Sequence, residues 1–205
     1  AVSRRAGAEG PRPRQSRCRY GVPVPARPAP DDTLTAATSA QDVMTWYDAH
    51  ARDLPWRRPG TTPWEVLVSE VMSQQTPVAR VVPAWQEWMR RWPGPAELAQ
   101  APTAAVLRVW GRLGYPRRAL RLIECARSVV EQHGGVLPDD LDALLALPGV
   151  GEYTAGAVLA FAHGRRALVL DTNVRRVLAR AVGGQALPAP SLSNCKAKEV
   201  IDQDG

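Results

Sequence analysis

A glycine-containing turn between two helical patterns decides the fold. It occupies residues 147–160, whose sequence is LPGVGEYTAGAVLA. Gly149 and Gly151 let the backbone turn sharply and approach another chain closely. The helix expected at 152–163 presents unpaired N–H groups and a positive dipole end at its first turn. This arrangement can bind a phosphate without a basic side chain. The alternative is a helix–helix turn in which glycine only shapes the backbone.

Helix start and stop signals lie on both sides of this turn. The segment Thr62-Pro63-Trp64-Glu65 has the form of a capping box with proline at the first helical position, and it predicts a helix to about Ser73. Thr76-Pro77 is expected to start the next helix in the same way, and that helix should end near Trp92. Further helices are expected at 39–51, 96–101, 103–110, 116–133, 139–147 and, with Asp171 as N-cap, 172–182. No stretch alternates with period two, so the predicted fold class is all-α.

Charge is distributed unevenly along the chain. The formal net charge is +6, but the first 30 residues hold seven arginines and one acid, Glu9, so the remainder is balanced. Net charge is therefore weak evidence for a nucleic-acid partner. We interpret residues 1–37 as a disordered Arg/Pro-rich tail, 38–185 as the folded domain and 186–205 as an irregular, divergent tail.

Cysteine spacing and hydropathy exclude several classes of protein. The three cysteines, Cys18, Cys125 and Cys195, are far apart, which argues against a disulfide framework, a zinc site or a complete cluster ligand set. We expect Cys125 to be an ordinary core thiol, and we expect no metal site. No apolar stretch is long enough to span a bilayer, and the Arg-rich start is not followed by an apolar run. A cytoplasmic protein without a membrane partner is therefore expected.

Two acidic residues have surroundings suited to catalysis. Glu70 lies among Val66, Leu67 and Val71 in an apolar helix, where partial burial would raise the pKa of its carboxyl. Asp171 directly precedes a helix, so capping alone could explain it. A helix-surface position is likewise the simple alternative for Glu70, and each acid taken alone is weak evidence.

Four motifs in a fixed order are more specific. They are SEVMSQQT at 69–76, LGYPRRAL at 113–120, the turn at 147–160, and VLDTNVRRVLAR at 169–180. Together they resemble the MutY-type adenine DNA glycosylases of the endonuclease III superfamily, over roughly residues 54–182. The resemblance implies a helix-hairpin-helix DNA glycosylase, built as a six-helix barrel module with an incomplete second helical module. It also implies hydrolysis of the N-glycosidic bond of adenine mispaired with guanine or 8-oxoguanine.

The resemblance also assigns roles to residues. Glu70 would protonate adenine, Asp171 would stabilise the sugar cation, and Tyr153 and Asn173 would complete the pocket. Endonuclease III-like enzymes with strand-cleaving activity carry a lysine at position 153, so Tyr153 implies a monofunctional enzyme without a Schiff base. Arg57, in Leu54-Pro55-Trp56-Arg57, would lie near the adenine pocket. The residues expected to contact DNA are Gln74, Gln75, Tyr115, Leu147, Gly149, Val150, Gly151 and Thr154.

Part of the family pattern is missing from this sequence. MutY proteins continue into a segment whose four cysteines hold a 4Fe–4S cluster, and this chain does not contain those ligands, so we expect no cofactor within it and interpret it as truncated. The expected partner is double-stranded DNA with a mismatched adenine, bound by a monomer in the bacterial cytoplasm. Two alternatives stay open: a catalytically weak or silent helix-hairpin-helix DNA-binding fragment, and a thymine- or uracil-mismatch glycosylase.

Overall fold

The computed structural model describes residues 40–167 and 169–181, and within these ranges every regular element is a helix. The all-α prediction is therefore confirmed for the described part of the chain. In chain order the elements are α1 (Ala40–His50), η2 (Pro55–Arg57), α2 (Pro63–Ser73), α3 (Val78–Arg91), α4 (Pro95–Gln100), α5 (Thr103–Trp110), η3 (Gly111–Leu113), α6 (Arg117–His133), α7 (Leu141–Ala146), α8 (Glu152–His163) and α9 (Thr172–Ala181).

Local signals explain most helix ends. The Thr62 hydroxyl accepts a hydrogen bond from the Glu65 N–H, and the Glu65 carboxylate accepts one from the Thr62 N–H, which completes the predicted capping box of α2. Gly134 and Gly164 end α6 and α8 in the left-handed conformation that glycine adopts without a Cβ penalty. No start or stop signal in the sequence predicts η2, a single turn of three residues.

The predicted cap at Thr76 is wrong. Pro77 occupies the N-cap position of α3, with no side-chain cap. The Thr76 side chain is buried instead, and its hydroxyl donates to the Leu113 carbonyl at 3.0 Å. A bond to a residue 37 positions away replaces the local one, because the loop after α2 packs against η3.

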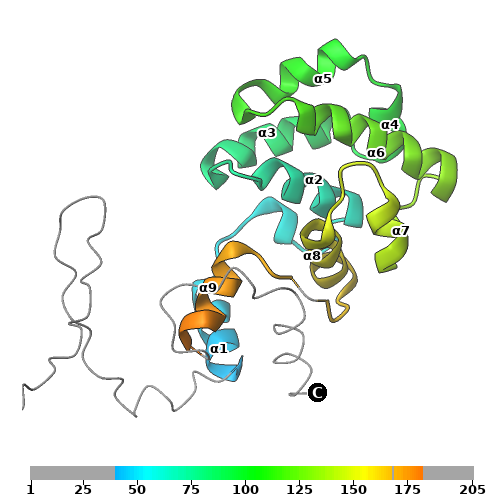
Figure 1. Ribbon diagram of the computed structural model, residues 1–205. Coiled ribbons are helices and arrows are strands. Elements are labelled where there is room, and N and C mark those ends of the chain that lie inside the picture. Colours follow the sequence, from blue (N-terminus) through cyan, green and yellow to red (C-terminus); the bar gives the residue numbers. More distant parts are fainter. Residues whose placement is uncertain (1–39, 168, 182–205) are drawn as a thin grey trace, which may run out of the picture. The chain divides into compact units, whose positions relative to one another are not determined.

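Helix α2 is the central element of the described helices. It contacts α3, α6 and α8, while α6 also packs on α4 and α5 (Figure 1). The residues between these helices form one apolar core that includes Leu67, Met72, Trp88, Trp110 and Val158. Because a helix buried on most sides carries few polar residues, Glu70 in the second half of α2 is an exception that needs a reason.

Six of the seven tryptophans are packing residues. They are Trp56, Trp64, Trp85, Trp88, Trp92 and Trp110, all buried. Trp46, on α1, is 61% exposed and stacks on His50. Cys125 is buried in the core, where burial raises the pKa of its thiol to about 12. Within the described ranges, no helix has both the length and the apolar character needed to cross a membrane.

Candidate functional site

Glu70 stands in the wall of a cavity rather than on the open surface. The cavity measures about 320 Å³ and is lined by Tyr47, Trp56, Arg57, Val66, Glu70, Ala160 and Phe161. Burial raises the pKa of the Glu70 carboxyl, while a hydrogen bond from Tyr153 and the charge of Arg57 act in the opposite direction. The expected environment of Glu70 is thus present: an acid held partly out of water beside a space that could admit a small ring.

Tyr153 connects the two acids. It lies in the first turn of α8, 38% exposed, and its hydroxyl hydrogen-bonds to the carboxyl of Glu70 on α2. Burial, then the charges of Glu70 and Asp171, raise the pKa of Tyr153 to about 12. Tyr153 is therefore a neutral hydroxyl near neutral pH, and the fold brings it within electrostatic range of both acids.

Asp171 caps α9 and is held in place by a second bond. Its Oδ1 accepts from the Val174 N–H at 2.6 Å, and its Oδ2 accepts from the Asn173 side-chain amide at 3.0 Å. The predicted capping role is confirmed. Since the cap uses one oxygen and Asn173 donates an N–H to the other, both ends of the carboxylate are fixed and its orientation is set.

Arg57 adds positive charge to the cavity. It lies in η2, and its guanidinium carbon is 5.5 Å from the centre of the Tyr47 ring. The same arginine lowers the pKa of Glu70 electrostatically. Arg57 and Glu70 line the same cavity, and a role of Arg57 toward the base stays a prediction.

The glycine hairpin has the shape that its sequence predicts. The Val150 N–H donates to the Leu147 carbonyl at 3.2 Å, and Gly149 has a φ of +81°, the pattern of a type II turn with Pro148 in the preceding position. A Cβ on Gly149 would lie 2.9 Å from the Cβ of Arg121 on α6, so both backbone angle and space require glycine there.

The hairpin residues named as DNA contacts differ in exposure. Leu147, Val150 and Thr154 have buried side chains, so any contact they make with a partner would come from the backbone. Gly151 is exposed and is the N-cap of α8, with no side-chain cap and open space where a Cβ would stand. The N-terminus of α8 therefore lies at an exposed glycine, and no side chain of that residue covers the first N–H groups of the helix.

Two further loops carry the other expected DNA contacts. Gln75 has a φ of +54° and Tyr115 a φ of +46°, and both side chains are exposed, Tyr115 by 63%. The left-handed conformation costs a non-glycine residue about 1–2 kcal/mol. Gln74 also lines a cavity of about 130 Å³ together with Gly149, Val150 and three arginines of α6, so this loop and the hairpin face the same space.

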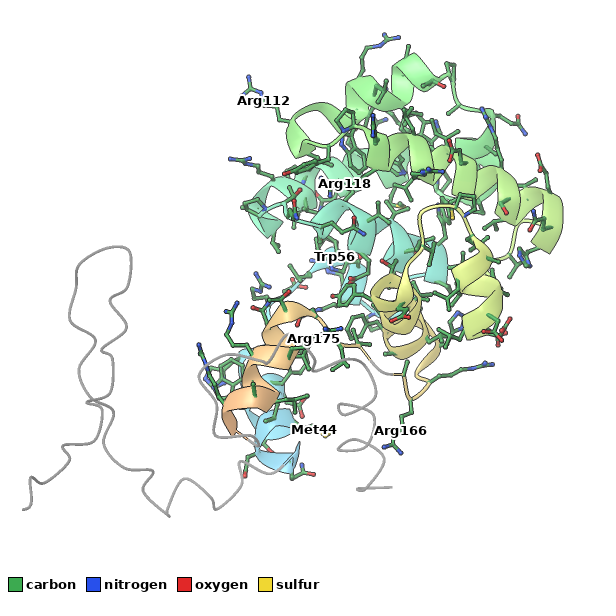
Figure 2. The ribbon with its side chains drawn as sticks, viewed as in Figure 1. Met44, Trp56, Arg112, Arg118, Arg166 and Arg175 are labelled. Atoms are coloured by element: carbon green, nitrogen blue, oxygen red, sulfur yellow. The ribbon has the colours of Figure 1, made fainter. Side chains whose placement is uncertain are left out.

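Sequence reasoning missed Arg118, which connects these two loops. In the sequence it is one of three arginines near the start of α6, with Arg117 and Arg121. The Arg118 side chain is half-buried and in Figure 2 lies over the helical body, whereas Arg112 points away from it. The only signal in the sequence is proximity to the LGY motif, which does not distinguish Arg118 from its neighbours.

The cysteines do not fit an iron–sulfur cluster. The chain has three, fewer than four ligands, and Cys125 is a core thiol whose raised pKa disfavours the thiolate that ligates iron. Among the described residues no three His, Cys, Asp or Glu side chains gather closely enough to hold a metal ion. The described part of the chain therefore offers no ligand set for such a cluster.

The chain is similar in sequence to known proteins. The chain is 55% identical over 166 residues to an adenine DNA glycosylase of Mycobacterium tuberculosis, covering 80% of this chain and 55% of that protein. It is 44% identical over 158 residues to the adenine DNA glycosylase of Homo sapiens, covering 73% of this chain and 29% of that protein. The chain thus spans about half the length, or less, of these curated relatives.

The fold comparison agrees. A solved structure of a thermostable thymine-DNA glycosylase matches with a TM-score of 0.64 and 29% sequence identity, covering 67% of this chain and 64% of that one. The profile of the HhH-GPD superfamily base excision DNA repair proteins matches residues 68–203, which include Glu70, Tyr115, the hairpin and Asp171. The chain therefore belongs to the HhH-GPD superfamily of base excision DNA repair proteins.

Proposed function

We propose that this chain carries the catalytic centre of a DNA N-glycosylase that hydrolyses the bond between adenine and deoxyribose. The observation that supports it most is the grouping of Glu70 and Tyr153, with Asp171 close enough to perturb the pKa of Tyr153. Enzymes that cleave a glycosidic bond commonly use two carboxyl groups in different environments. The adenine DNA glycosylases to which the chain is similar support adenine as the base.

The proposed reaction assigns one task to each acid. Glu70, whose carboxyl pKa is raised by burial, donates its proton to a ring nitrogen of the extruded base as the C1′–N bond breaks. The Asp171 carboxylate, oriented by Asn173, stabilises the positive charge on the sugar. The oxygen of a water molecule then adds to C1′, and the proton released from that water passes to a carboxylate. Tyr153 positions the Glu70 carboxyl through its hydroxyl and offers no amine for a Schiff base.

We assign DNA binding to the hairpin and the two loops. Backbone N–H groups at Gly149, Gly151 and the start of α8 would contact phosphates, which position the duplex without reading its sequence. Gln75 and Tyr115, both exposed, would fill the gap left by the extruded nucleotide, with Gln74 beside them. Arg57 would face the base in the cavity that it shares with Glu70. The mismatch partner, guanine or 8-oxoguanine, and a monomeric state are parts of this proposal.

The direct test uses labelled duplexes with one adenine opposite guanine or 8-oxoguanine. After incubation with the protein, alkali cleaves the strand only where a base has been removed. We expect cleavage at the mismatched adenine by the wild-type chain and none by Glu70→Gln. No cleavage by either, with duplex binding intact, would favour a silent DNA-binding fragment. That second candidate draws on Val43, Met44 and Trp46 of α1, whose exposed apolar side chains contribute little burial to stabilise the domain.

A third set of duplexes tests which base is the substrate. The similarity to a thymine-DNA glycosylase structure makes thymine or uracil opposite guanine the other base to test. Cleavage there, and not at adenine, would replace the substrate in the proposal while leaving the roles of Glu70 and Asp171 unchanged. Borohydride in the same reactions tests the mechanism, because only a Schiff-base intermediate is trapped as a covalent protein–DNA adduct. We expect no adduct.

A further inference from the structure

Two exposed loops are held by a single side chain. We name residues 74–76 the glutamine loop and residues 113–115 the tyrosine loop. We propose that Arg118 is a positioning residue that fixes both loops in the geometry needed to extrude a nucleotide from the duplex. This inference rests on the proposed glycosylase function for its purpose, but the positioning itself can be measured without any activity.

The contacts of Arg118 are unusually many for one guanidinium. Its Nη1 and Nη2 donate to six oxygens at 2.6–3.2 Å, namely the carbonyls of Val71, Met72, Gln74, Leu113 and Gly114 and the hydroxyl of Thr76. These acceptors come from the end of α2, the glutamine loop and the tyrosine loop. Among the described contacts of Arg118 there is no carboxylate, so its charge is compensated by the dipoles of these carbonyls.

The acceptors surround the two residues that need support. Gln74 and Thr76 flank Gln75, and Gly114 directly precedes Tyr115. Gln75 and Tyr115 are the non-glycine residues with positive φ in the described part of the chain. The Arg118 guanidinium carbon also lies 5.6 Å from the centre of the Tyr115 ring and 5.2 Å from that of Trp110. Residues in such conformations persist only when surrounding contacts determine them.

The chemistry selects arginine over lysine. A planar guanidinium presents donors in a fixed fork and can reach both loops at once, while an ammonium is a point charge with three donors. The Thr76 hydroxyl adds a direct link, since it donates to the Leu113 carbonyl. The two loops thus form one unit around Arg118, with the exposed side chains of Gln75 and Tyr115 projecting from it.

Hydrogen–deuterium exchange tests the positioning. The variants are Arg118→Met and Arg118→Lys. The control is Val129→Ala, which opens a cavity in the core beside the same helix, about three turns from Arg118. Melting curves first establish the stability loss of each. We expect Arg118→Met to speed exchange of the amides at 75–76 and 114–115 at least tenfold more than the control does, with partial protection in Arg118→Lys. If Arg118→Met does not fold, Thr76→Val and Arg118→Lys carry the measurement. Exchange in these loops no faster than in the control overturns the proposal.

A second measurement concerns extrusion. A duplex with 2-aminopurine at the target position gains fluorescence when that base leaves the stack. At saturating protein we expect the wild type to give this gain and Arg118→Met to lose most of it, whereas Val129→Ala keeps it. A full gain with Arg118→Met overturns the purpose assigned to the loops. No gain and no base excision with the wild type would instead count against the proposed function, and the exchange result would still decide whether Arg118 positions the loops.

Discussion

Replacing the two glycines of the hairpin one at a time separates fold from DNA contact. Gly149→Ala places a side chain at a φ of +81°, which costs about 1–2 kcal/mol, and puts its Cβ 2.9 Å from that of Arg121, which adds an overpacking cost of about 1–2 kcal/mol. The total of about 2–4 kcal/mol corresponds to a fall in Tm of about 10 °C in a chain of this size.

Gly151→Ala should behave in the opposite way. Its φ of −105° suits alanine and nothing lies within 4 Å of the added Cβ. Glycine is a somewhat better N-cap than alanine, but the more restricted unfolded chain offsets part of that difference, so Tm should change by no more than about 3 °C. The added methyl group would stand where we expect a phosphate. Loss of one charge-assisted hydrogen bond, about 1.5–3 kcal/mol, would weaken duplex binding about 10- to 100-fold.

The assays are thermal melting and fluorescence anisotropy with a labelled duplex at one fixed salt concentration, since phosphate contacts depend on salt. Gly134→Ala is the matched control, because it has a φ of +61° and nothing within 4 Å of its added Cβ. It should lose only the cost of the backbone angle and should bind DNA normally. Wild-type affinity in Gly151→Ala would refute the assignment of the hairpin, and an unchanged Tm in Gly149→Ala would refute the steric reasoning.

Three further predictions concern the acids. Burial raises the pKa of Glu70, so ionised Glu70 opposes folding, and the stability of the wild type should fall as pH rises from about 4.3 through the folded pKa. Glu70→Gln should therefore melt at a higher temperature than the wild type at pH 8 and at the same temperature near pH 4. This variant should excise no base. Asn is as good an N-cap as Asp, so Asp171→Asn should keep Tm within about 2 °C and slow excision at least about 100-fold; excision at the wild-type rate would contradict the role of the carboxylate. The Tyr153 hydroxyl lowers the pKa of Glu70, so Tyr153→Phe should move the basic limb of the pH–rate profile upward, and an unmoved or downward limb would count against that contact.

The exposed apolar residues of α1 bear on all of these experiments. Val43, Met44, Trp46 and Tyr47 are each at least 44% exposed, and on α9 Val177 is 61% exposed. Exposed apolar side chains of this size contribute little to stability. Variants should therefore be compared with the wild type in the same preparation, and each activity should be reported beside a melting curve, so that loss of folding is not counted as loss of chemistry.

The sequence determined the features that depend on neighbouring residues. The capping box at Thr62, the glycine ends of α6 and α8, the Leu147–Val150 turn and the cap at Asp171 are all local hydrogen bonds or backbone angles. The groups that form each of these features lie within a few residues of one another in the chain, so pattern alone predicts them. The order of the four motifs along the chain also indicated the family.

Only the tertiary structure decided which distant groups meet. It placed Tyr153 against Glu70 and within range of Asp171, turned Thr76 from an expected cap into a link to Leu113, and gave Arg118 its six acceptors. A pattern of neighbouring residues could not have shown the contacts of Tyr153, of Thr76, or of Arg118 with α2 and the glutamine loop, because these join segments that meet only when the core packs. The burial of Glu70 also depends on the tertiary structure. The apolar helix around Glu70 was visible in the sequence, but the cavity beside that helix is formed by η2, α1 and α8.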